Sequence, residues 1–402
     1  MGCSVLLLAT METKHEAIAY FRAVMDRHGV HCHVLDLSLN ARGEVLSGAR
    51  KLQTMAEVAN NASVLAREAI EAGATAAVSI GGGTGGEIAL RVMRSMPFAF
   101  PKMLVTTLPF DPRYALADNA IVIVPTLADV CGINAALRQA LENAGSMLAG
   151  LCQASNTLPH VSTNPSVGIT ALGATGACAD GLADALKAEG QEATVFHANG
   201  FGGAAYARFA RCGTFHSVVD MTLHELTRIH VAGAHVEMPD RLTAARDAGV
   251  PQVVLPGGLN FIGLGELGLV PPAYLERPHY QHTGFFTHVQ VTEDEMVRVA
   301  GKLADALNGA SAPVSLLVPM GGFSHQDAPG GAIESPALRE VFLKVMQETL
   351  SSSVALRPLD HHINDARTVH AIMDALRPHL PAPNEAAPKA SHEGTTHVRA
   401  EA

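Results

Sequence analysis

The chain has 402 residues, and its 28 Lys and Arg against 38 Asp and Glu give it a formal net charge of −10. Because no basic run interrupts this acidic balance, the composition argues against nucleic acid or an anionic membrane as a partner bound through bulk charge. Apolar residues make up 48% of the chain, which is enough to fill the cores of two or three ordinary domains.

The N-terminal segment and the cysteines predict a cytoplasmic protein. The apolar run from Val5 to Ala9 has the length of a strand, with no basic segment before it and no evident cleavage signal. No apolar stretch approaches the length of a membrane span. The six cysteines are scattered without a C-x-x-C pair, which is typical of reduced thiols.

The first 152 residues alternate short apolar runs with amphipathic stretches. The apolar runs predict strands at 4–10, 30–37, 76–80, 101–108 and 120–127. The amphipathic stretches predict helices at 14–29, 55–73, 86–96 and 128–151. Strands that are apolar throughout and alternate with helices are typical of a parallel sheet covered on both faces.

The alternation stops at a polar segment with two prolines and then resumes. Further strands are predicted at 167–173, 192–198, 217–221, 251–256, 313–319 and 354–360, and further helices at 177–190, 238–249, 292–310 and 336–350. We therefore expect an α/β protein with two Rossmann-like parallel-sheet domains, at 1–152 and 167–380, that meet at an interdomain cleft. A linker at 153–166 joins them, and the Pro- and Ala-rich segment 381–402 is expected to be a disordered tail.

A glycine-rich stretch lies between the third predicted strand and the following helix. It reads "SIGGGTGGE" and contains Gly81, Gly82, Gly83, Thr84, Gly85 and Gly86. Converging backbone N–H groups and the positive end of a helix would bind a phosphate or a carboxylate there. Glycine would equally allow a strand and a helix to pack closely, and the stretch is neither a dinucleotide fingerprint nor a P-loop. Both interpretations stay open at this point.

Polar residues follow other predicted strands of the same sheet. They are Thr10, Thr13 and Lys14 after the first strand, Asp36 at the end of the second, and Thr106 and Thr107 at the end of the fourth. Ligands of parallel sheets bind beyond the carboxyl ends of the strands, so we expect these side chains to share one crevice. Lys14 would neutralise a phosphate and Asp36 would meet a ribose hydroxyl, whereas Thr10 and Thr13 would also serve as helix N-caps.

The second half carries titratable residues at its predicted strand ends. The candidates for acid–base catalysis are His197, Glu225, Asp360 and His362. The histidines of "HYQHTGFFTH" and "HHIND" are also ligand types for a transition metal, but their spacing matches no zinc signature, so no metal ligand set is assigned. In "HHIND", Asn364 or Asp365 would instead cap the last helix. Cys178, which begins a helix, is either an activated thiolate or a packed side chain.

Several of these motifs together resemble the Tm-1-like ATP-binding family, named for tomato mosaic virus resistance and containing many bacterial proteins. The resemblance is carried by "ATMETKHEAIAYFR", "SIGGGTGGEIA", "PKMLVTT" and "ADVCGINAALRQALENAGSMLAG" in the first half, and by "VGITALGATGACADGL", "VFHANGFGGAA" and "LDHHIND" in the second. It implies two Rossmann-like domains, with ATP and Mg²⁺ held by the first. The implied ligand contacts are Thr10, Thr13, Lys14, the glycines of 81–86, Thr106 and Thr107.

Three functional hypotheses follow from residues and resemblance together. The first is an ATP-binding enzyme, expected to form a homo-oligomer, that acts on a small carboxylate in the interdomain cleft. The second is an ATP-independent lyase or hydrolase of a small oxo-acid, with or without a metal, in which the glycine stretch holds the carboxylate. The third is a nucleotide-gated interaction module without catalysis.

Overall fold

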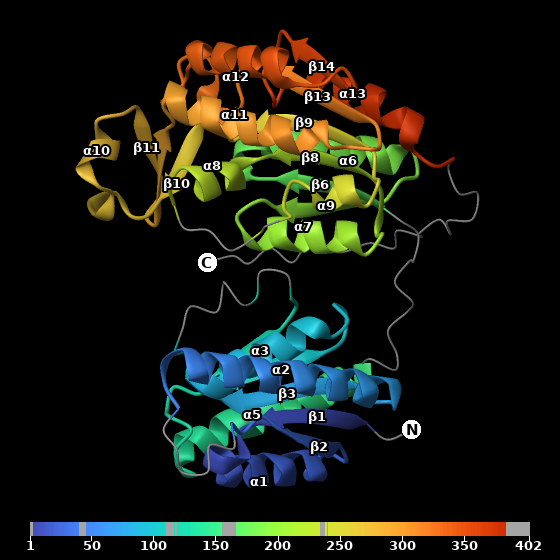
Figure 1. Cartoon of the computed structure of the whole chain (residues 1–402), viewed down its shortest axis with the longest axis vertical. Helices are drawn as coiled ribbons and strands as arrows, with labels where there is room; N and C mark the ends of the chain where they lie inside the picture. Colours follow the sequence, from blue (N-terminus) through green and yellow to red (C-terminus); the bar gives the residue numbers. More distant parts are fainter. Residues whose placement is uncertain are drawn as a thin grey trace, which may run out of the picture.

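The protein consists of two α/β domains, each built on its own parallel sheet (Figure 1). This computed structural model describes residues 3–39, 46–109, 116, 119–154, 166–233, 238 and 240–382. The predicted linker at 153–166 and the predicted tail at 381–402 fall almost entirely outside the described residues.

The first domain has a five-stranded sheet in the order β2-β1-β3-β4-β5, and all neighbouring strands are parallel. The strands are β1 (Ser4–Ala9), β2 (His31–Asp36), β3 (Ala76–Gly81), β4 (Lys102–Thr106) and β5 (Val122–Pro125). The helices are α1 (Met11–Arg27), α2 (Gly48–Glu71), α3 (Gly83–Ser95) and α5 (Ala135–Ala154). This order reverses direction between β1 and β3, which makes their carboxyl ends the topological switch point of the sheet.

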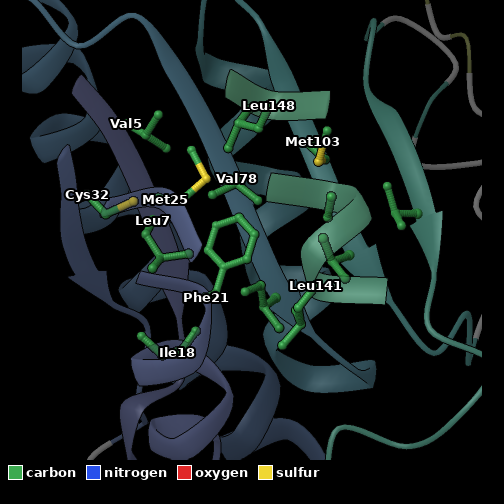
Figure 2. Close-up of a cluster of buried hydrophobic side chains, with 14 of the residues drawn as sticks. Val5, Leu7, Ile18, Phe21, Met25, Cys32, Val78, Met103, Leu141 and Leu148 are labelled. Carbon is green, nitrogen blue, oxygen red and sulfur yellow. The ribbon is translucent and has the colours of Figure 1, made fainter. Parts of the chain in front are cut away.

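Both faces of this sheet are covered, as its apolar strands predict. Val5 and Leu7 of β1 pack in a cluster with α1 and α5, whereas Leu6 and Leu8 pack in a second cluster with α2 and α3. Alternate residues of a strand point to opposite faces, so one apolar run serves both clusters. Figure 2 shows the first cluster, in which Phe21 of α1 lies among side chains of the sheet and α5.

The second domain has a six-stranded parallel sheet in the order β14-β13-β9-β8-β6-β7. Its strands are β6 (Ser166–Ala171), β7 (Ala193–His197), β8 (Phe215–Thr222), β9 (Gln252–Gly257), β13 (Val314–Pro319) and β14 (Val354–Leu359). Its longer helices are α6 (Gly176–Ala188), α7 (Phe201–Arg211), α11 (Glu293–Asn308), α12 (Pro336–Thr349) and α13 (Ala366–Leu376). Read from β7, the strands follow the same order as in the first domain, with one strand added at the far edge.

The structure departs from the predicted elements in several places. A small antiparallel sheet of β10 (Phe261–Leu264), β12 (Phe286–Gln290) and β11 (His279–Thr283) lies beside the second domain, together with α10 (Pro272–Leu275) (Figure 1). The predicted helix at 128–151 begins only at Ala135, because Asn134 accepts a hydrogen bond from the Leu137 N–H at 2.9 Å. Of the predicted helix at 238–249, the described part contains only α9 (Ala244–Asp247).

Helix α7 was not predicted, because its first turn lies within the glycine-rich stretch "ANGFGG". Two of these glycines pack against their surroundings at close range. A Cβ on Gly202 would overlap the backbone of His197, and a Cβ on Gly203 would overlap the Glu225 carboxylate. The second glycine-rich stretch therefore serves close packing. The Glu225 carboxylate belongs to α8 (His224–His230).

No helix in the described part of the chain has the length and apolarity needed to cross a bilayer.

Candidate functional site

A pocket of about 460 Å³ lies at the carboxyl end of the first sheet, at the switch point between β1 and β3. Three segments surround it: the turn from β1 into α1, the chain that follows β2, and the turn from β3 into α3. Residues after β4 and β5 complete it. Its lining residues are Thr10, Glu12, Thr13, Lys14, Leu39, Leu46, Lys51, Gly82, Gly83, Thr84, Gly85, Thr107 and Asp129.

Helix α3 begins inside the glycine stretch, three residues before the predicted start. Gly82 occupies the N-cap position, and the Gly86 N–H donates to the Gly82 carbonyl at 2.8 Å. The N–H groups of residues 83–85 precede the first intrahelical donor, so they have no acceptor within the helix, and they lie at its pocket end. This end of the helix also carries the positive part of its dipole, so the pocket presents donors and positive potential together.

The glycines allow α3 to approach the turn after β1. A Cβ on Gly85 would stand 3.3 Å from Cγ2 of Thr10, and one on Gly81 would stand 3.4 Å from the backbone nitrogen of Gly86. The separation at Gly85 is tighter than most Cβ contacts, and the one at Gly81 lies at the lower limit of ordinary van der Waals contact. The packing interpretation of the stretch is therefore correct, and the same close approach brings the open helix end to the pocket.

The turn after β1 brings a hydroxyl pair and a cation to the same place. Thr10 and Thr13 share a hydrogen bond between their hydroxyl oxygens at 3.0 Å, and the Thr10 side chain caps no backbone N–H. Lys14 interrupts α1 with non-helical dihedral angles (φ −126°, ψ 15°). Its Nζ donates to the carbonyl of Val130, 2.5 Å away, and its side chain lines the pocket.

Asp36, at the end of β2, stabilises the turn between β1 and α1 through hydrogen bonds. Its Oδ1 accepts from the N–H of Met11 at 3.1 Å and from the N–H and hydroxyl of Ser38 at 2.9 and 2.6 Å. Burial raises the pKa of Asp36, but the hydrogen bonds from Ser38 and Met11 outweigh it and lower the pKa below its usual value. Asp36 does not line the pocket, so its contact with a ribose stays a prediction. Thr106 is fully buried, and Thr107 lines the pocket.

The four residues predicted for acid–base catalysis lie at the carboxyl ends of the second sheet. Among the described contacts, no hydrogen bond or ion pair joins any two of them. The His197 side chain is exposed at the end of β7. Asp360 is 86% exposed and accepts from Nδ1 of His361 at 2.8 Å. The catalytic roles of these residues stay predictions.

Glu225 belongs to a buried ionic network. Its Oε2 accepts from Nε of Arg241 at 2.5 Å, and its Oε1 accepts from the N–H groups that begin α7, at Gly200 (2.5 Å) and Gly203 (3.1 Å). The two other guanidinium nitrogens of Arg241 donate to Asp220 at 2.6 and 2.8 Å. Arg241 is 2% exposed and Glu225 is fully buried. This network satisfies the Glu225 carboxylate and holds α7, β8 and α8 together.

His362 is also held by neighbouring groups. Its Nε2 lies 2.9 Å from the Ser324 carbonyl, and its Nδ1 accepts from the Asn364 N–H at 3.0 Å. A neutral ring with its proton on Nε2 satisfies both contacts. Asp365 accepts from the Arg367 N–H at 2.9 Å and caps α13, which confirms the capping interpretation of "HHIND".

Neither a metal centre nor an activated thiol is found in the described part of the chain. No group of three or more His, Cys, Asp or Glu side chains there is arranged to hold a metal ion. Cys178 is fully buried, and burial raises its pKa to about 12, so the interpretation of Cys178 as an activated thiolate was wrong.

We expect Cys178 to resist alkylation by iodoacetamide at pH 8 in the folded protein, because a buried thiol with this pKa is not ionised. Cys131 and Cys212 are exposed and provide the internal comparison. Mass spectrometry of tryptic peptides, with and without prior unfolding in urea, measures the three reactions. Modification of Cys178 as fast as Cys131 before unfolding would contradict the structure.

Two of the three histidines of "HYQHTGFFTH", His282 and His288, stack on each other, whereas Nδ1 of His279 lies 2.7 Å from the Arg277 carbonyl. The rings of His282 and His288 lie 4.7 Å apart, and Phe261 separates His288 from His224 with stacked contacts of 4.3 and 4.4 Å. The Tyr280 hydroxyl lies 2.7 Å from Nδ1 of His288. Burial, with smaller contributions from His282 and Arg228, lowers the pKa of His288 to about 3.

We expect the His288 ring to stay neutral down to about pH 4. Because its pKa is lower in the folded chain than the ~6.5 of an unfolded histidine, protonation favours unfolding, and stability is lost as the pH falls from about 6.5 towards 3. Histidine ring signals in an NMR titration measure this directly, with the urea-unfolded chain as the reference. A midpoint near 6.5 for His288 in the folded protein would contradict the prediction.

The sequence analysis identified most residues of the pocket between β1 and β3, but it missed Leu39, Leu46 and Lys51. Lys51 belongs to the first turn of α2, which begins at Gly48, seven residues before the predicted start. The intervening segment is polar and gave no apolar periodicity. A lysine in the first turn of a helix that follows a strand end was the only available signal.

Known proteins resemble the chain along nearly its whole length. Models of an uncharacterised protein family, UPF0261, match residues 3–157 (N-terminal domain) and 164–380 (C-terminal domain). A UPF0261 protein of Clostridium tetani is 27% identical, over 94% of this chain and 98% of its own. A UPF0261 protein of Mesorhizobium japonicum is 31% identical, over 75% of this chain and 77% of its own.

A tomato protein also matches. The ToMV resistance protein Tm-1 of Solanum lycopersicum is 27% identical, over 98% of this chain but 52% of its own length, so the chain spans about half of that relative. The resemblance to Tm-1-like proteins is thereby confirmed at the level of the family.

Proposed function

The chain belongs to the uncharacterised protein family UPF0261, and we propose that its first domain binds ATP with Mg²⁺ in the pocket between β1 and β3. The observation that carries the proposal is the convergence of the open N-terminus of α3 and the side chain of Lys14 on one pocket. A helix N-terminus or a lysine side chain at a pocket is common by itself. Together, at the switch point of a parallel sheet, they have the chemistry of a phosphate site.

The size and charge of the pocket fit a nucleoside triphosphate. Its volume of about 460 Å³ falls within the range of small-molecule sites. Lys14 and Lys51 supply positive charge for the phosphates, and the hydroxyls of Thr10 and Thr13 supply donors. Leu39 and Leu46 give an apolar surface against which a base would pack.

Carboxylate oxygens suited to Mg²⁺ line the same pocket. Glu12 and Asp129 are exposed acidic residues there, and Mg²⁺ is held by one or two carboxylates together with phosphate oxygens. The ion would screen the charge of the phosphates. We restrict the proposal to binding, because no hydrogen bond or ion pair described in the structure joins any two of the residues predicted for catalysis in the second domain.

Calorimetric titration of the full chain tests the proposal. With Mg²⁺ present, we expect ATP to bind more tightly than ADP, and adenosine to bind least, because the phosphates meet the helix end and Lys14. Lys14→Gln should weaken ATP binding about tenfold, the effect of losing one hydrogen bond to a charged group. Lys187→Gln, an exposed lysine of α6, is the matched control and should change nothing. Equal affinities for ATP and adenosine would contradict the proposal.

A further inference from the structure

A second hollow lies between the two domains, away from the ATP pocket. Its volume is about 670 Å³, and it is lined by residues of α2 and α3 of the first domain and of α7 of the second. This is the interdomain cleft that the sequence predicts, but none of the residues predicted for binding or catalysis lines it. Its lining residues are Asn60, Ser63, Val64, Arg67, Arg91, Arg94, Ser95, Arg208 and Arg211.

Five of these nine lining residues are arginines, and none is acidic. Arg91 and Arg211 have carboxylate partners outside the lining, in Glu87 (2.6 Å) and Asp240. Five guanidinium groups therefore surround one hollow in a chain whose net charge is −10. Five guanidinium groups and no carboxylate in the lining give the hollow a chemistry that suits an anion.

The arginines come from both sides of the domain boundary, where the two domains touch. Arg208 of α7 donates to the carbonyl of Met96, just beyond α3, at 3.0 Å, and its guanidinium lies 5.5 Å from the ring centre of Phe98. Phe98 also meets Phe209 of α7 edge to face, with ring centres 4.9 Å apart. A ligand in the hollow therefore touches both domains beside a contact that already fixes their approach.

We propose that the arginine hollow binds a small oligophosphate anion that bridges the two domains. Guanidinium groups pair with phosphate oxygens in a planar, bidentate manner, and several of them favour a ligand with several phosphates. The serine hydroxyls and the Asn60 amide in the lining add neutral donors for the remaining oxygens. The inference is independent of the ATP pocket, since no residue lines both.

Titration of the full chain with inorganic tripolyphosphate, followed by calorimetry, tests the inference. We expect Arg67→Gln with Arg94→Gln, on the first domain, to weaken the tripolyphosphate affinity of the hollow at least about tenfold. Arg211→Gln, on the second domain, should weaken it about fivefold or more. All three side chains are exposed, so these variants should fold, which circular dichroism checks. Arg22→Gln with Arg357→Gln, two exposed arginines elsewhere, removes the same charge as a control and should leave binding unchanged.

The two sites are separated by making these measurements in the Lys14→Gln background. Tripolyphosphate binding that depends on the hollow should persist there, whereas ATP binding should fall. Absence of tripolyphosphate binding to the wild-type chain at millimolar concentration would overturn the inference. So would equal losses in the arginine variant and its charge control, or a loss confined to variants of one domain.

Discussion

Gly82→Asp is expected to weaken ATP binding by at least about a hundredfold while leaving the fold as stable as that of the parent. Gly82 occupies the N-cap of α3 with negative φ (−93°), so a side chain adds no left-handed strain. A Cβ there meets only the Thr107 hydroxyl, at 3.4 Å. Aspartate is a favoured N-cap residue, and its carboxylate would accept from the same N–H groups that the phosphates need. It also places a negative charge where the phosphates would lie.

The matched control for this change is Gly82→Asn, which has the same shape without the charge. We expect the asparagine variant to weaken ATP binding less than the aspartate variant, by about tenfold, because it occupies the donors without repelling the ligand. Calorimetry gives the affinities, and a thermal melt shows that both variants are folded. Retained ATP affinity in a folded Gly82→Asp protein would return the glycine stretch to a purely structural role.

Arg241→Met is expected to destabilise the protein by about 3–5 kcal/mol. The substitution leaves the carboxylates of Asp220 and Glu225 buried without their partner, and the cost of an uncompensated buried charge exceeds the packing lost. Equilibrium unfolding in urea measures the loss.

The control is Arg246→Met, three residues beyond α9's N-cap, a half-buried arginine whose carboxylate partner, Asp247, is exposed. A surface ion pair contributes at most about 1 kcal/mol, so the control should stay close to the parent. Similar losses in the two variants would show that the network does not bear on the stability of this domain.

Much of the fold could be predicted from local pattern. The run "SVLLLA" is apolar at nearly every position, so it predicts a strand covered on both faces, and Leu6 and Leu7 indeed pack in different clusters. Polar residues after such strands predict the crevice, because parallel strands end at one edge of the sheet. Lys14 was brought together with Gly82, Gly83 and Gly85 in this way, whereas Gly81 and Gly86 of the same stretch do not line the pocket.

Other features depend on contacts that no local pattern contains. Arg241 lies in a polar segment and is buried because it pairs with Asp220 and Glu225, which are 21 and 16 residues away. The glycines that begin α7 signalled a loop, but they are required by the closeness of His197 and Glu225. In each case the decisive neighbour is distant in the sequence, and spacing alone does not identify it.

The two sheets share a strand order, but the switch point of the first opens into a pocket and that of the second is filled by a buried ionic network. Both sheets reverse direction after their second strand, between β1 and β3 in one and between β6 and β8 in the other. In the first domain the carboxyl ends of these strands open into a pocket. In the second, Asp220 near the end of β8 and the neighbouring Glu225 are occupied by the Arg241 guanidinium. A phosphate site is therefore expected in the first domain.

Backbone amide shifts at the start of α3 report whether the phosphates of ATP bind to the N–H groups of this helix end. In an NMR titration of the isotopically labelled full chain with ATP and Mg²⁺, we expect the amide signals of Gly83, Thr84 and Gly85 to shift most strongly. Adenosine alone should leave them nearly unmoved. ATP binding that shifts other amide signals while these three stay in place would contradict a phosphate site at the start of α3.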